Sequence, residues 1–161
     1  MNKPLQDALK WIIGVLEDNK ITYQITGGFA AHIYGSTREV NDIDIDISEG
    51  SFQIILEDVR SKIVYGPCRY QDAKWDLQLM TLNYNGQEID IGGAFETKIF
   101  DSINQTWVPF PGDFSKRRHM LFAGTDIYVV DPQSLIEYKS LLDGKHQKED
   151  IAAIKKYLER T

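Results

Sequence analysis

The sequence lacks the features of secreted, membrane-spanning and nucleic-acid-coating proteins. Its 161 residues include one cysteine, Cys68, which cannot form a disulfide within the chain. The net charge of −6 argues against a broad basic surface for long nucleic acids. No segment approaches the ~18 apolar residues that a membrane span requires. We therefore expect a cytoplasmic protein that binds neither membranes nor long nucleic acids.

The composition is that of an ordinary globular protein. Hydrophobic residues make up 42% of the chain and charged residues 26%. Charges such as Asp7 and Lys10 interrupt the first apolar segment, which has helical spacing and is therefore predicted to be an amphipathic helix rather than a signal peptide. We predict a single domain over residues 1–161, with a core of about 1–125 and a C-terminal strand and helices over 126–161.

An alternation of aspartate and isoleucine over residues 42–47 is the most informative feature of the sequence. Side chains alternate between the two faces of a strand, so Asp42, Asp44 and Asp46 share one face and the isoleucines share the other. Like charges in a row repel each other, so this face needs a cationic partner. A divalent metal ion with bound phosphates is the simplest candidate, and this indicates an enzyme that handles nucleotides.

Two glycines, Gly27 and Gly28, stand between a predicted strand and a predicted short helix. Glycines let backbone N–H groups approach an anion closely at a helix N-terminus. A tight turn would explain the pair in isolation, but its position before the acidic strand favours a phosphate site. Arg38 follows this helix and is predicted to bind phosphate or to pair with an aspartate, and the two roles do not exclude each other.

Periodicity and turn residues predict an α/β chain that ends in a helical pair. Asn85-Gly86 is typical of a type I′ hairpin turn, and Asp131-Pro132 is typical of the start of a helix. Residues 95–124 are predicted to be irregular, because prolines and glycines punctuate them. The predicted strands are 21–26, 42–47, 75–84, 87–91 and 127–130. The predicted helices are 4–18, a short one after the glycine pair, one that begins after Ser48 or Ser51, and the pair 132–142 and 148–160.

The order of these motifs resembles the polymerase-β-like nucleotidyltransferase superfamily. The resemblance is strongest over residues 25–47, and the motifs look most like those of small lincosamide-type antibiotic nucleotidyltransferases and of abortive-infection toxin nucleotidyltransferases. It implies an α+β fold with a mixed sheet flanked by helices and a C-terminal helical pair. The matching motifs are Gly27-Gly28-Phe29, Thr37-Arg38, Asp42-Ile43-Asp44-Ile45-Asp46 and Ile89-Asp90-Ile91.

The resemblance implies a Mg²⁺-dependent enzyme that transfers a nucleoside monophosphate, most often AMP, from a nucleoside triphosphate to a hydroxyl. Asp42, Asp44 and Asp90 would be the catalytic and metal-binding triad, with two Mg²⁺ ions as the expected cofactors. Glu88 and Asp76 are alternative third carboxylates, since Glu88 shares the strand face of Asp90 and Asp76 begins the neighbouring strand.

The resemblance also implies a nucleotide-binding set, formed by Gly27, Gly28, Arg38 and Lys139. An ordinary surface lysine is the alternative for Lys139. Asp46 lies roughly 13 Å from Asp42 along the strand, too far to share one ion, and is expected to pair with a lysine or arginine.

The acceptor is not predicted by these motifs. The lincosamide type continues its third aspartate with Ile-His-Pro, whereas this chain has Ile91-Gly92-Gly93. Small-molecule hydroxyls, tRNA and protein side chains therefore stay open as acceptors. A toxin-type transferase and a catalytically idle nucleotide-binding module are the competing functions. Trp107 and Phe110 are candidates for a homodimer contact.

Overall fold

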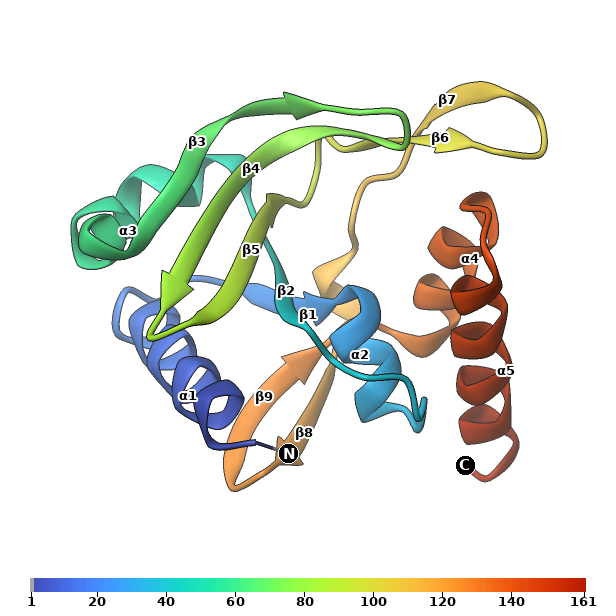
Figure 1. Cartoon of the computed structure of the whole chain (residues 1–161), viewed down its shortest axis with the longest axis horizontal. Helices are drawn as coiled ribbons and strands as arrows, with labels where there is room; N and C mark the ends of the chain where they lie inside the picture. Colours follow the sequence, from blue (N-terminus) through green and yellow to red (C-terminus); the bar gives the residue numbers. More distant parts are fainter. Residues whose placement is uncertain (1) are drawn as a thin grey trace.

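A mixed β-sheet runs through the molecule and carries the acidic strand near its centre (Figure 1). The computed structural model describes residues 2–161. Within them the strand order is β7-β6-β4-β5-β2-β1-β9-β8, and β3 pairs with β4 beside this path. The strands are β1 (Tyr23–Thr26), β2 (Asp42–Ile47), β3 (Ile63–Gln71), β4 (Trp75–Tyr84), β5 (Gln87–Gly93), β6 (Lys98–Asp101), β7 (Thr106–Pro109), β8 (Arg118–Phe122) and β9 (Thr125–Val129).

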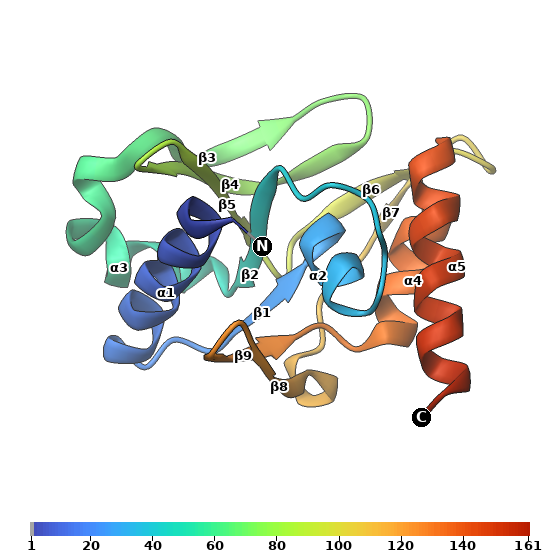
Figure 2. The same ribbon diagram turned by 60° about the horizontal axis from the view of Figure 1, so that its bottom comes forward.

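Helices stand at both ends of the sheet and in the middle of the molecule. In both ribbon views α1 and α3 lie together at one end, α4 and α5 at the other, and α2 between them (Figures 1 and 2). Among residues 2–161 no helix has the length and apolar character that crossing a membrane would demand. The helices are α1 (Lys3–Asp18), α2 (Gly27–Ile33), α3 (Phe52–Val59), α4 (Pro132–Leu141) and α5 (Lys145–Glu159).

The predicted α+β class and C-terminal helical pair are confirmed. The acidic strand has the predicted bounds. Asn85 and Gly86 adopt φ of 50° and 93°, the two positive values that a type I′ turn requires. The Asp131 side chain accepts a hydrogen bond from the backbone N–H of Ser134 and caps α4 as predicted.

The prediction that residues 95–124 are irregular is wrong, because β6, β7 and β8 lie there. β6 and β7 have four residues each and pair with one another, and β6 also pairs with β4, where Ile99 faces Trp75. Strands of four or five residues show little alternation, and the prolines and glycines between them dominate the sequence signal of this segment.

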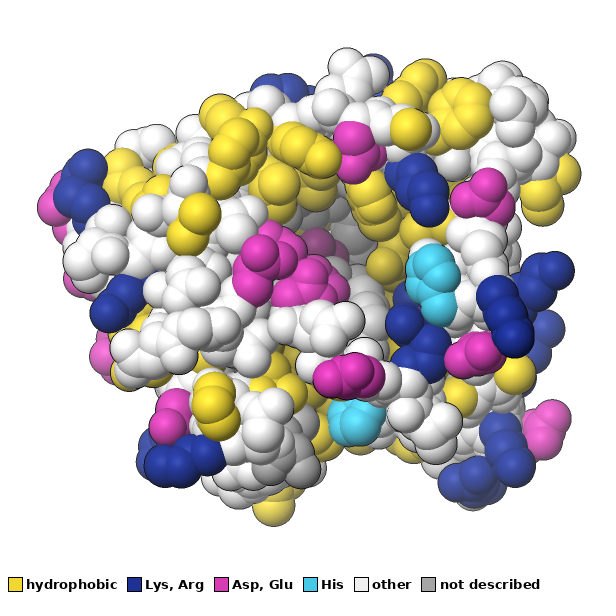
Figure 3. All heavy atoms as spheres, in the orientation of Figure 1, with side chains coloured by type: hydrophobic (Ala, Val, Ile, Leu, Met, Phe, Trp, Pro, Cys, Tyr) yellow, Lys and Arg dark blue, Asp and Glu magenta, His cyan; other side chains and the backbone are white. Residues whose placement is uncertain are grey.

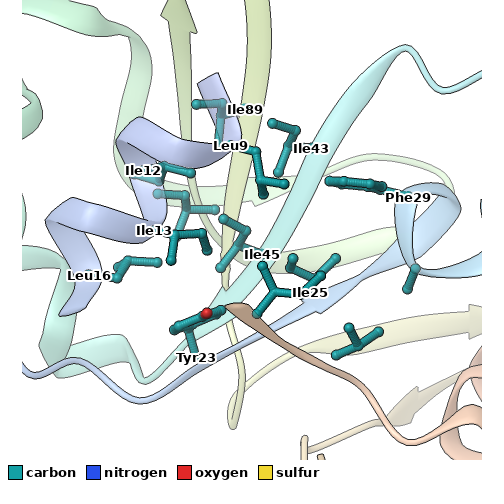
Figure 4. Packing of buried hydrophobic residues seen from close by; sticks show 14 of the residues in the cluster. Leu9, Ile12, Ile13, Leu16, Tyr23, Ile25, Phe29, Ile43, Ile45 and Ile89 are labelled. Atoms are coloured by element: carbon teal, nitrogen blue, oxygen red, sulfur yellow. The ribbon is translucent and has the colours of Figure 1, made fainter. Parts of the chain in front are cut away.

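The core holds β2 in one register. Ile43, Ile45 and Ile47 are fully buried, and Figure 4 shows the first two directed toward α1, where Leu9 and Ile12 lie. Burying one such side chain contributes roughly 1.5–3 kcal/mol. A slip of one residue would expose the isoleucines and bury the aspartates, so core packing fixes which face of β2 carries carboxylates.

Candidate active site

Three carboxylates from two adjacent strands meet on the sheet face opposite the core isoleucines. Asp42 and Asp44 come from β2 and Asp90 comes from β5, which runs parallel to β2 with Asp90 opposite Asp44. One oxygen from each side chain lies within 4.8 Å of the others. We call these three residues the carboxylate cluster. Sequence analysis predicted its members, and the parallel pairing brings them together.

The electrostatics of the cluster suit a bound cation. Burial raises the pKa of Asp42, and the negative charge of Asp90 raises it further. Burial also raises the pKa of Asp44 well above its usual range, and repulsion from Asp42 and Asp90 adds to the effect. Oxygen donors of this kind are those that Mg²⁺ prefers. The three side chains therefore fit a divalent metal ion, which would stabilise their ionised forms.

The geometry separates Asp90 from the two alternative third carboxylates. Asp90 receives a hydrogen bond from the hydroxyl of Thr81, with Oγ1 2.7 Å from Oδ1, which orients its carboxylate. The carboxylate of Asp76 instead accepts a hydrogen bond from Arg69 at 2.7 Å. Glu88 is exposed near the start of β5 and is not one of the three cluster residues.

Asp46 has a different environment from the one predicted. Its hydrogen bond comes from the side-chain amide of Gln24 at 3.3 Å, where sequence analysis expected a lysine or arginine. Burial raises the pKa of Asp46 to about 7, and the Gln24 hydrogen bond offsets only part of this effect. The expectation overlooked Gln24, which lies opposite Asp46 across the β1–β2 pairing.

The glycine pair lies directly beside the carboxylate cluster. Gly27 begins α2 with φ of 66°, and a Cβ there would overlap Asp44, with Cγ only 2.8 Å away. A Cβ on Gly28 would meet Nη2 of Arg38 at 3.4 Å. A side chain at Gly27 would therefore collide with Asp44, and one at Gly28 would contact Arg38 closely.

Arg38 and Lys139 meet at a buried carboxylate, Asp150 of α5. Arg38 binds it through Nε at 2.9 Å and Nη2 at 2.6 Å, and Lys139 Nζ lies 2.9 Å from its Oδ2. Ser36 donates a further hydrogen bond to Asp150 at 2.7 Å, and Gln147 accepts one from Lys139 at 3.0 Å. These donors hold the pKa of Asp150 at about 2 despite its burial.

The buried position of Lys139 excludes the surface-lysine alternative, since only 2% of the residue is exposed. Burial lowers the pKa of its ammonium group, and Asp150 opposes that effect. Sequence analysis left open whether Arg38 pairs with an aspartate. It does, and the partner comes from the C-terminal helix rather than from the acidic strand.

One cleft of about 910 Å³ brings the predicted site residues together. Its lining includes the carboxylate cluster, both glycines, Arg38 and Lys139, so the structure brings together every predicted site residue. Figure 3 shows a hollow with acidic side chains on one side and basic side chains on the other.

Two residues that contribute to this arrangement were missed by sequence analysis. Asp150 joins Arg38 to Lys139, and no local pattern in the sequence indicates that contact. Thr81 orients Asp90, and a threonine within an alternating strand carries no sequence signal for that role.

Comparison with solved structures places this fold among nucleotidyltransferases. A Thermotoga maritima protein assigned as a nucleotidyltransferase matches 100% of this chain and 97% of its own length, with a TM-score of 0.71 and 21% identity. The lincosamide antibiotic adenylyltransferase LnuA, solved with lincomycin bound, matches 97% of this chain and 99% of its own, with a TM-score of 0.64 and 17% identity. ANT(2″)-Ia, solved in complex with adenylyl-2″-tobramycin, matches 94% and 88%, with a TM-score of 0.61 and 12% identity.

No model of a known protein family matches the chain, and no curated protein does. The structural matches establish the polymerase-β-like nucleotidyltransferase fold that the motifs predict. At identities of 12–21% these matches show the fold.

Proposed function

We propose that the protein is a Mg²⁺-dependent nucleotidyltransferase that transfers AMP from ATP to a hydroxyl acceptor. The observation that carries this proposal is the carboxylate cluster, which shares one cleft with a half-buried arginine and a buried lysine. The choice of ATP is supported by two structural relatives, since LnuA is named an adenylyltransferase and ANT(2″)-Ia was solved with an adenylylated product.

In the proposed reaction, a bond forms between the acceptor oxygen and the α-phosphorus. The bond from the α-phosphorus to the bridging oxygen breaks, and pyrophosphate leaves. Asp42, Asp44 and Asp90 would hold two Mg²⁺ ions, which when bound supply positive charge to the reacting phosphoryl oxygens. Asp90 would accept the proton of the acceptor hydroxyl, with Thr81 orienting its carboxylate through Oδ1.

The nucleotide would lie on the α2 and α4 side of the cluster. Gly27 and Gly28 offer backbone N–H groups without a side chain in the way, which allows close approach of the triphosphate. The Nη1 group of Arg38 and one ammonium proton of Lys139 are not used by Asp150 or Gln147 and can reach phosphate oxygens. Asp150 therefore orients two cations without neutralising both.

Beside Lys139, two aromatic rings offer a surface for the nucleobase. The rings of Tyr138 and Phe110 lie 6.3 Å apart, and both residues line the cleft. This position uses Phe110 within the site, which leaves Trp107, 36% exposed, as the candidate for self-association. We also propose a cytoplasmic location, which cell fractionation would test. A homodimer contact at Trp107 would be tested by comparing the sedimentation of wild type with that of Trp107→Ser.

Calorimetry with each nucleoside triphosphate, with and without Mg²⁺, tests the proposed function without knowledge of the acceptor. Wild-type protein should bind ATP only with Mg²⁺, and the double variant Asp42→Asn/Asp44→Asn should lose this binding. The double variant should unfold at the same or a higher urea concentration than wild type, because it removes like-charge repulsion. That stability serves as the control for folding.

Two results would contradict the proposal. One is ATP binding that persists unchanged in the double variant. The other is no binding of any nucleoside triphosphate to wild type, which would favour a catalytically idle protein.

A further inference from the structure

The face of β4 that lines the cleft is apolar, although a strand face in contact with water is usually polar. Leu77 and Leu79 of β4 line the cleft at alternate positions and are only half-buried. On the opposite face of the same strand, Met80 and Leu82 are fully buried in the core. An antiparallel strand with one face in water normally alternates apolar and polar residues. β4 is apolar on both faces here, so its cleft face is suited to a ligand.

The apolar surface continues onto the neighbouring strand β3. Tyr70 lies opposite Leu77 in the β3–β4 pairing, and Tyr65 lies opposite Thr81. The two tyrosine rings meet edge to face with centroids 6.0 Å apart, and Tyr65 is 42% exposed. We call Tyr65, Tyr70, Leu77 and Leu79 the apolar wall. Figure 3 shows hydrophobic side chains gathered along the rim of the hollow, next to the acidic cluster.

The apolar wall leads directly to the proposed catalytic carboxylate. Tyr65 is the register partner of Thr81, and Thr81 both lies opposite Asp90 on β5 and donates a hydrogen bond to it. A molecule resting on the wall would therefore place one end beside Asp90. The proposed triphosphate site is on the other side of the cluster, toward α2 and α4, so the two ligands can be bound together.

The chemistry of the wall selects a class of acceptor. Among the described residues of β3 and β4 that line the cleft, none is charged, and the polar atoms are the hydroxyls of Tyr65, Tyr70 and Thr81 and the indole N–H of Trp75. A polycationic acceptor would need carboxylates here, and a densely hydroxylated one would need many more hydrogen-bond partners. Aromatic edges and leucine side chains instead match a flat apolar body.

Resting on the proposed function, we propose that the acceptor is a hydroxyl compound with a flat apolar body, of the aromatic-alcohol class. Its body lies on the apolar wall, and its hydroxyl lies beside Asp90. The nucleotidyl group is then transferred to that oxygen as described above, with the hydroxyl proton passing to Asp90 and pyrophosphate leaving.

Fluorescence titration with 2-naphthaleneethanol tests the acceptor class directly. The protein is saturated with Mg²⁺ and a non-hydrolysable ATP analogue, so that binding is measured without turnover. The probe should bind wild type, and Leu79→Asp should weaken its binding by about tenfold or more, because a carboxylate in an apolar contact has no partner. The matched control is Leu121→Asp on β8, outside the cleft and 72% exposed in wild type, which should leave probe binding unchanged. Both variants should bind the ATP analogue like wild type.

The outcomes separate the acceptor class from the proposed function. Probe binding that is lost in Leu79→Asp alone, with analogue binding intact, supports the proposal. If the analogue binds but the probe does not, or if tobramycin binds in its place, the acceptor class is wrong while the nucleotidyltransferase function stands. If analogue and probe displace each other, the wall holds the nucleobase, and the acceptor proposal is overturned. If neither ligand binds, both proposals fail.

Discussion

Replacement of Asp150 by asparagine gives a quantitative test of how the basic side of the cleft is built. The carboxylate is fully buried and accepts hydrogen bonds from Ser36, Arg38 and Lys139. Asparagine has nearly the same shape but no charge, so two cations would lose their counter-charge, and one amide N–H₂ would face donors.

Lowering the pKa of Asp150 from 3.8 to about 2 corresponds to about 2 kcal/mol of stability, at about 1.4 kcal/mol per pKa unit. Breaking a buried ion pair typically costs about 3–5 kcal/mol. We therefore expect Asp150→Asn to lower the free energy of unfolding by about 2–4 kcal/mol at pH 7.

The pH dependence of this loss distinguishes an electrostatic cause from a packing cause. Because the folded pKa of Asp150 is lowered, its contribution is fully present above about pH 4 and disappears as the pH falls toward about 2. Urea denaturation of wild type and Asp150→Asn should show a stability difference that narrows over that interval. Asp7→Asn is the control, because the exposed pair of Asp7 with Lys3 should contribute less than about 1 kcal/mol. A difference at pH 7 no larger than that of the control, or one independent of pH, would refute the reasoning.

Two further substitutions test the remaining parts of the site. Gly27→Ala should abolish ATP·Mg²⁺ binding in calorimetry, because its Cβ would overlap Asp44. It should also lower the free energy of unfolding by more than the ~1–2 kcal/mol expected from backbone strain alone. Gly35→Ala is the matched control, with φ of 114° and nothing within 4 Å, and equal losses in the two variants would contradict the clash. Thr81→Val should lower kcat by about tenfold while leaving ATP·Mg²⁺ affinity unchanged, because it removes the hydrogen bond that orients Asp90. An unchanged kcat would show that Asp90 needs no such orientation.

The acidic strand was predictable because its signal is local. The alternation of aspartate and isoleucine over Asp42–Ile47 depends only on the two-residue period of a strand, and the structure reproduces its bounds. The Asn85-Gly86 turn was predictable for a similar reason, since few residues adopt two consecutive positive φ values.

The rest of the site depends on contacts between distant parts of the chain. Arg38 and Asp150 are separated by 112 positions and meet only because α5 packs against α2. The apolar wall needs the pairing of β3 with β4, in a region where sequence analysis defined only β4. The prediction of a lysine or arginine partner for Asp46 was wrong because β1 places Gln24 opposite it. No local sequence pattern predicts that pairing.

Local patterns in the sequence therefore identified the candidate residues of the site, because the glycine pair, the arginine and the carboxylates have direct physical meaning where they stand. The orientation of these residues, and the groups that lie opposite them, depend on the tertiary structure. The parallel pairing of β2 with β5 brings Asp90 to Asp44, Asp150 joins the two cations, and β4 turns an apolar face to the cleft. These arrangements arise from strand pairing and helix packing between distant parts of the chain. Such long-range contacts produce no periodic pattern in the sequence of the residues that make them.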